Sequence, residues 1–167
     1  MAVTTEQIRE LRERTGAGIM DAKKALEATD GNLDKAEAAL LAKGLAKAAT
    51  KSDRSTAEGV IGSYIHAGGR IGAMVELNCE TDFVARTPEF VELARNIAMQ
   101  VAAMSPLYLD EADKPADEPR KAEEVCLLKQ SFIKDSSKSI ADVVMDLRAR
   151  IGENIQVRRF VRYNLGE

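Results

Sequence analysis

The sequence predicts an α+β fold, in which a small antiparallel sheet packs against helices and a three-helix module precedes it. Two stretches of different pattern support this prediction. Near the N-terminus, apolar residues recur at helical spacing, whereas residues 71–79 alternate between apolar and other positions, as in a strand with one buried face. A chain of 167 residues is long enough for one domain with a substantial core and a small additional module.

Residues 1–54 are expected to form the three-helix module and a basic linker. Thr4 can open a capping box at the first helix, and Asn32 can cap the third. The turn at residues 15–18 separates the first two helices, and Gly44 can end or interrupt the third. Helices of about three turns are unstable alone, so these are expected to pack together.

Residues 55–167 are expected to form the core domain. Residues 60–66 and 71–79 are interpreted as the two strands of a hairpin with one buried face. Thr87 and Pro88 begin a helix, since Thr is a good N-cap and Pro at the first helical position gives up no hydrogen bond. This helix carries an apolar stripe of Phe90, Leu93, Ile97, Val101 and Met104.

The C-terminal part of this domain is expected to contain helices and a final strand. Residues 106–119 are rich in proline and acidic residues and are interpreted as a solvated, mobile loop. Residues 122–128 are expected to be helical, and Ser139 with Asp142 to cap a further helix. Residues 155–165 alternate as a long final strand.

Composition argues against binding to nucleic acid or to a membrane. The net charge is −3 and aromatic residues make up 4% of the chain, so neither a basic field nor a stacking platform is expected. The N-terminus lacks the pattern of a secretory signal, and no apolar stretch approaches the roughly 18 residues that span a bilayer. We therefore expect a cytoplasmic protein.

The residues do not indicate an enzyme, and no metal or cofactor is expected. One histidine, His66, and two cysteines cannot supply the usual zinc ligands. Cys79 falls on the buried side of its strand, so a reactive His66–Cys79 pair is a minor alternative to a buried, inert cysteine. The glycine-rich loops that bind nucleotide phosphates are absent from the sequence.

The connection Thr81-Asp82-Phe83-Val84 is the candidate working surface. Phe83 can fold back over the sheet as part of the core, or it can point outward as an anchor for a partner protein. Spacing alone favours the first interpretation, because most apolar residues in connections are simply packed.

Several motifs resemble those of the translation elongation factor Ts family. They are Leu11–Leu26 (LRERTGAGIMDAKKAL), Val75–Ala85 (VELNCETDFVA), Ile151–Ile155 (IGENI) and Val157–Phe160 (VRRF). The resemblance covers nearly the whole chain. One departure is that this chain lacks, between about Tyr108 and Arg120, a helical stretch that other members carry.

The resemblance implies a guanine-nucleotide exchange factor for elongation factor Tu, without covalent catalysis. It assigns the exchange role to Asp82 and Phe83, flanked by Thr81 and Val84, which would enter the GTPase near its magnesium site. Exchange would then proceed by release of GDP from the partner.

The resemblance also implies that the N-terminal module is ubiquitin-associated-like and docks on the GTPase domain of the partner. Arg12, Ile19 and Met20 occupy contact positions of the family. Ile19 is expected to face the core of the module in part, and Met20 to point outward. His66 matches a further contact position.

Short members of the family with a single core tend to form homodimers, which implies a complex of two copies of this chain with two of the partner. The final strand could offer an edge for pairing with a second copy. The main alternative is a binding adaptor with a ubiquitin-associated-like module that does not promote exchange.

Overall fold

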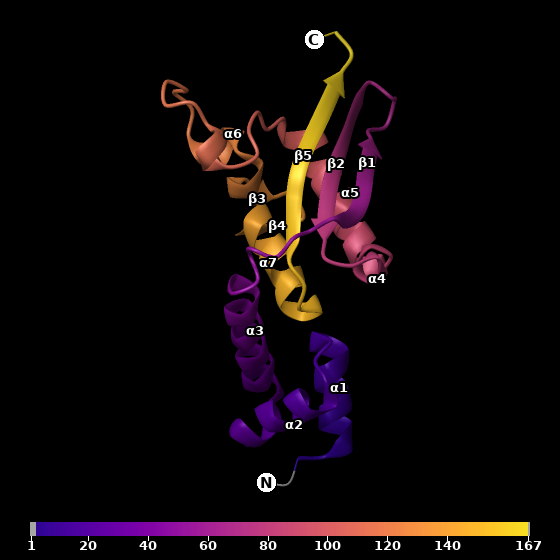
Figure 1. Cartoon of the computed structure of the whole chain (residues 1–167), viewed down its shortest axis with the longest axis vertical. Coiled ribbons are helices and arrows are strands. Elements are labelled where there is room, and N and C mark those ends of the chain that lie inside the picture. Colours follow the sequence, from indigo (N-terminus) through magenta and orange to yellow (C-terminus); the bar gives the residue numbers. More distant parts are fainter. Residues whose placement is uncertain (1–2, 167) are drawn as a thin grey trace. The chain divides into compact units, whose positions relative to one another are not determined.

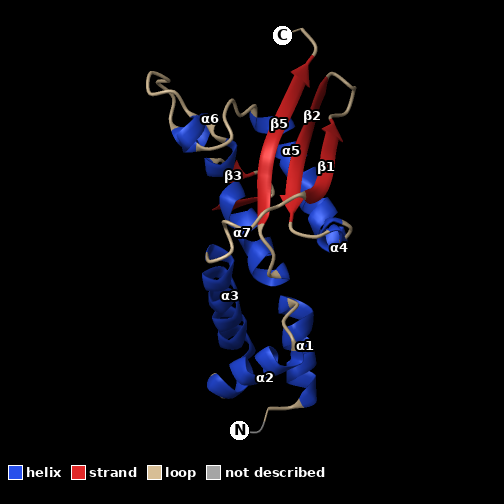
Figure 2. Cartoon of the chain, in the orientation of Figure 1, coloured by secondary structure: helices blue, strands red, loops and turns tan. Residues whose placement is uncertain are grey.

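The computed structural model describes residues 3–166 and divides into two compact units (Figure 1). The first unit contains the chain up to Asp53 together with Asp146–Glu153, and the second contains Arg54–Met145 together with the chain from Asn154 onward. Among the described residues, helices build the first unit, whereas a three-stranded sheet and helices build the second (Figure 2). The predicted α+β class is confirmed.

Three helices form the N-terminal part of the first unit: α1 (Thr5–Thr15), α2 (Ile19–Ala28) and α3 (Leu33–Ala49). The Thr4 side chain accepts a hydrogen bond from the Gln7 amide, and the Gln7 side chain accepts one from the Thr4 amide. This confirms the predicted capping box. Gly16 ends α1 with a left-handed φ of 69°, and Asn32 caps α3 as predicted.

The third helix is longer than predicted, because Gly44 does not end it. α3 continues through this glycine and has 17 residues. A Cβ atom at position 44 would lie 2.8 Å from the carbonyl oxygen of Ala149, a residue of α7 (Ile140–Ile151) that belongs to the same unit. The glycine therefore permits a close backbone approach and does not serve as a helix stop.

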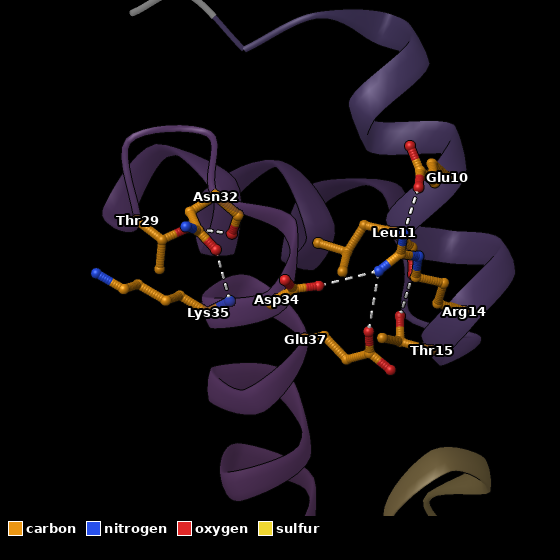
Figure 3. A network of polar contacts seen from close by, with 9 residues as sticks. All are labelled: Glu10, Leu11, Arg14, Thr15, Thr29, Asn32, Asp34, Lys35 and Glu37. Atoms are coloured by element: carbon orange, nitrogen blue, oxygen red, sulfur yellow. Dashed lines mark hydrogen bonds and ion pairs between the residues drawn. The ribbon is translucent and has the colours of Figure 1, made fainter.

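A small apolar core holds the three helices together. Its fully buried members are Leu11, Ala22, Leu26 and Ala36. Figure 3 shows the Arg14 guanidinium of α1 directed at Asp34 and Glu37 of α3, with nitrogen–oxygen distances of 3.2 and 3.6 Å. Because these charged groups are substantially exposed, the ion pairs add little, and the apolar core supplies most of the stability.

The second unit is built on an antiparallel sheet of β1 (Glu58–Ile65), β2 (Ile71–Cys79) and β5 (Ile155–Asn164), in the order β1-β2-β5. The first two strands form the predicted hairpin, with Val60 opposite Leu77. α5 (Pro88–Met104) packs on one face of this sheet (Figure 2). A Cβ atom at Gly62 would lie 2.6 Å from the carbonyl carbon of Ala94, so this glycine lets the helix approach closely.

The apolar stripe of α5 is confirmed except at its end. Phe90, Leu93, Ile97 and Val101 are buried, whereas Met104 is 48% exposed. Gln100, which the sequence did not mark as a core residue, is fully buried. Its side-chain amide donates to the Gln130 side chain at 3.2 Å and its carbonyl oxygen accepts from the Ile133 amide at 2.9 Å. These bonds satisfy a buried polar group and fasten residues 130–133 to α5.

Shorter elements complete the second unit. They are α4 (Asp82–Ala85), η1 (Glu111–Asp113), α6 (Ala122–Val125), η2 (Leu127–Lys129), β3 (Ser131–Phe132), β4 (Asp135–Ser139) and the first half of α7. The expected helix at 122–128 is interrupted, because Cys126 leaves the helical conformation and bridges to Tyr108. Ser139 and Asp142 cap α7 as predicted, with mutual bonds of 2.8 and 3.1 Å.

Residues 106–119 are largely exposed, as predicted. Polar contacts join the two ends of this segment. The Glu118 carboxylate accepts bonds of 2.6 and 2.7 Å from the Arg120 guanidinium and one of 3.4 Å from the Tyr108 hydroxyl. The hydrogen bonds from Arg120 lower the pKa of Glu118 to about 2. Polar contacts within the segment and with Arg120 therefore hold this connection together in the structure.

Candidate partner-binding site

The connection that follows β2 presents Phe83 to solvent. Thr81 caps the short helix α4, with its hydroxyl accepting from the Val84 amide at 3.4 Å. Phe83 is 79% exposed, whereas Val84 is 9% and Ala85 is 5% exposed. Spacing favoured a core position for Phe83, and this interpretation is wrong, because Val84 and Ala85 fill the core beneath α4 instead. We call Thr81–Val84 the exposed turn.

The exposed turn is fixed to the sheet and to α5 at both ends. On the strand side, the Cys79 thiol donates to the Thr81 carbonyl oxygen at 3.2 Å. On the helix side, the Thr87 hydroxyl donates to the Val84 carbonyl oxygen at 2.8 Å, and the Thr87 hydroxyl oxygen accepts from the Phe90 amide at 3.4 Å as the N-cap of α5. The aromatic ring therefore stands on a supported backbone, which limits the entropy lost when it enters a partner's pocket.

Asp82 lies beside Phe83 and is accessible. Its carboxylate is 2.9 Å from the guanidinium of Arg86, and the side chains are 43% and 78% exposed, respectively. An exposed pair of this kind contributes little to stability, and it leaves the carboxylate available to another charged group. Arg86 was not among the predicted site residues, although its spacing of four residues from Asp82 is the signal that could have found it.

The three predicted docking residues gather around the turn between α1 and α2. The Arg12 guanidinium donates to the Ala17 carbonyl oxygen at 3.2 Å, while Ile19 and Met20 begin α2. Ile19 is 57% and Met20 63% exposed. Met20 points outward as expected, but Ile19 is more exposed than predicted, because Ala22 and Leu26 already supply the core face of α2.

His66 lies at the tip of the hairpin, far along the strands from Cys79. Its amide donates to the Ile71 carbonyl oxygen at 2.9 Å, and its Nδ1 is 3.2 Å from the Tyr64 hydroxyl. Cys79 pairs across the sheet with Glu58, at the opposite end of the hairpin, and it is fully buried. The register therefore contradicts a reactive His66–Cys79 pair.

Toward the tip of the hairpin, the face of the sheet opposite α5 carries exposed apolar side chains. Met74 lies opposite Val161 on the neighbouring strand, and Ile65 and Tyr163 flank Gly72 on either side. These four side chains are between 38% and 70% exposed. We call them the open sheet face.

Within residues 3–166, no group of three or more His, Cys, Asp or Glu side chains is arranged to hold a metal ion. None of the described helices is both long and apolar enough to cross a membrane. A supported backbone with a solvent-exposed aromatic side chain is typical of a protein-binding factor.

Comparison with known proteins identifies the family. The family model described as Elongation factor TS matches residues 45–121 and 118–167. Among curated relatives named Elongation factor Ts, that of Desulfitobacterium hafniense is 50% identical over 195 residues, covering 99% of this chain and 90% of the relative. Those of Syntrophomonas wolfei and Methylacidiphilum infernorum are 48% and 49% identical, each over 99% of this chain, and 91% and 96% of the relatives. The chain belongs to the elongation factor Ts family, and its role is in translation elongation.

The same comparisons indicate that this chain is shorter than the matching part of its relatives. An alignment of 195 residues with a chain of 167 leaves at least 28 positions at which the relative alone has residues. The family model matches in two segments that meet at residues 118–121. This agrees with a missing stretch near Tyr108–Arg120, where the contacts of Glu118 close the chain.

Proposed function

We propose that this protein is a guanine-nucleotide exchange factor for elongation factor Tu and acts in the cytoplasm. Membership of the elongation factor Ts family supports the partner and the role. The observation that carries the mechanism is the orientation of Phe83, which is 79% exposed on a backbone fixed at both ends.

In the proposed mechanism, Phe83 enters between helices of the GTPase and Asp82 approaches its magnesium site. The partner holds GDP through its magnesium ion and through backbone amides of its phosphate loop. A carboxylate beside that ion competes for its coordination shell, and loss of the ion removes the largest positive charge next to the diphosphate. The affinity for GDP then falls.

Exchange of this kind is an equilibrium coupling and drives no net reaction. The factor weakens GDP binding by the same ratio as GDP weakens binding of the factor. A coupling of ~3 kcal/mol corresponds to a change of about 150-fold in affinity. Abundant GTP then fills the emptied site and releases the factor.

Exposure separates the residues of the exposed turn that would contact the partner from those that would hold the turn in place. Phe83 and Asp82 would contact the partner, whereas Thr81 and Val84 would hold the turn, since one caps α4 and the other is buried. Exposure of Arg12, Ile19 and Met20 supports their role in docking on the GTPase domain. Exposure of His66 at the hairpin tip is compatible with a further contact.

We propose in addition that two copies of this chain associate, giving a two-plus-two complex with the partner. The open sheet face and the position of β5 at the edge of the sheet both support self-association. Light scattering at micromolar concentration is expected to give about twice the 18.2 kDa mass of the chain. A monomeric mass under those conditions would contradict this part of the proposal.

The test of exchange is the release of fluorescently labelled GDP from elongation factor Tu after addition of excess unlabelled nucleotide. The wild-type chain is expected to accelerate release, and Asp82→Ala to accelerate it less. Chelation of magnesium should reduce the difference in the rate of GDP release between Asp82→Ala and the wild type, because the ion on which Asp82 acts is then already absent. Binding without acceleration by the wild type would favour the adaptor alternative.

A further inference from the structure

Glu80 joins three segments of the second unit at the base of the exposed turn. It lies between Cys79, the last residue of β2, and Thr81, the cap of α4. One carboxylate oxygen accepts from the Asn154 backbone amide at 2.7 Å, and the other lies 3.3 Å from the Arg54 guanidinium. The Asn154 side-chain amide donates in turn to the Arg54 carbonyl oxygen at 2.8 Å.

The two contacts of Glu80 differ in strength. Asn154 is 1% exposed and the Glu80 side chain is 19% exposed, so the short bond to the amide is charge-assisted and largely shielded from water. The Arg54 side chain is 55% exposed and its contact is longer, so it adds much less. Of these two contacts, the bond to the Asn154 amide is therefore the stronger.

This bond completes the support of the exposed turn. A helix of four residues such as α4 cannot hold its own conformation. Thr87 fixes its far end and the Cys79 thiol bonds to Thr81, but both donors come from the same stretch of chain. Glu80 adds a bond to a residue 74 positions away, at the start of the segment that continues as β5.

We propose that Glu80 is a positioning residue for nucleotide exchange, which holds the backbone beneath Asp82 and Phe83 through the Asn154 amide. This inference rests on the proposed exchange function and deepens it. Glu80 acts through the exposed turn and not on the partner, since its two oxygens already face donors of this chain. Without the Glu80 side chain, the exposed turn must become ordered as the partner binds, and the entropy lost in this ordering weakens the affinity for the partner.

The test uses the full-length chain with Glu80→Ala, Glu80→Gln and Arg54→Ala. Glutamine keeps an oxygen that can accept from the Asn154 amide, so Glu80→Gln should remain close to the wild type. Glu80→Ala should raise the concentration of factor needed for half-maximal GDP release by about tenfold, as ordering is lost, while the rate at saturation changes little. Arg54→Ala should stay within about twofold of the wild type.

Hydrogen exchange of the free chain separates this inference from the proposed function. In Glu80→Ala, the backbone amide hydrogens of a peptide covering residues 79–86 should exchange with solvent faster than in the wild type, while peptides from β1 and α5 keep their protection. If Glu80→Ala does not fold, Glu80→Asp replaces it, because the shorter side chain cannot reach the Asn154 amide. Unchanged protection at 79–86, or equal defects in Glu80→Gln and Glu80→Ala, would overturn the inference. If the wild type does not accelerate GDP release, the proposed function is overturned, and hydrogen exchange would still decide whether Glu80 holds the exposed turn.

Discussion

Two connections flank α5, and they differ in which side chains they expose and which they pair within the chain. The connection before α5 buries Val84 and exposes Phe83, on a backbone held by Cys79 and Thr87. The connection after α5, at residues 105–121, directs its charged groups at one another, as Glu118 does with Arg120. The first is suited to recognition, whereas the charged groups of the second are already paired within this chain.

The difference shows that exposure alone does not identify a recognition surface. Leu107 in the second connection is 51% exposed, yet no residue of that connection has a proposed role in exchange. Phe83 combines greater exposure, an aromatic ring and the adjacent Asp82, all on a supported turn. Aromatic anchors of this kind dominate binding energies at interfaces.

The largest expected effect on stability comes from the buried half of the first connection. Val84→Ala removes two methyl groups from a site that is 9% exposed, so the free energy of unfolding should fall by about 1–3 kcal/mol. Thermal or denaturant unfolding measures this loss. An unchanged unfolding curve would show that Val84 does not anchor the exposed turn.

The second connection should respond to pH through Glu118. Its folded-state pKa of about 2 lies below the usual 4.5, so the ionised carboxylate stabilises the folded state. This contribution is complete above about pH 4.5 and is lost as the pH falls toward 2. Glu118→Gln should therefore have a lower Tm than the wild type at pH 7, and the difference should shrink across that acid range. A gap that stays constant with pH would contradict the ion pair with Arg120.

The smallest expected effect is that of Arg86. Its pair with Asp82 is exposed, so Arg86→Ala should change the free energy of unfolding by no more than about 0.5 kcal/mol. Chemical denaturation with Arg86→Lys as the matched control measures this difference. A loss several times larger would mean that the pair helps to hold the first connection together.

Local signals in the sequence were sufficient to predict the framework of the fold. The capping pairs Thr4–Gln7 and Ser139–Asp142 and the alternation of residues 71–79 all depend on near neighbours, and the structure confirms each of them. The family was predicted from its motifs, and the comparisons confirm it.

Features that depend on distant contacts could not be predicted. Gly44 was interpreted as a residue that ends or interrupts its helix, because nothing local shows that Ala149 lies against it. Gln100 was not predicted to be buried, because the groups that bond to it belong to Gln130 and Ile133. Spacing alone favoured a core position for Phe83, because nothing local shows that Val84 and Ala85 occupy that space, and only the resemblance to the family indicated the outward orientation. The contact of Glu80 with the Asn154 amide could not be predicted from the sequence, because the two residues are 74 positions apart.

The most direct test of the account compares Phe83→Ala with Leu107→Ala, one exposed apolar residue from each connection. Labelled GDP release from elongation factor Tu should slow by roughly 30-fold relative to the wild type for Phe83→Ala, the effect of losing a hot spot of ~2 kcal/mol. Leu107→Ala should match the wild type, and both variants should keep its Tm, because both side chains are mostly exposed. Wild-type rates of release with Phe83→Ala would contradict the central claim that this side chain drives exchange.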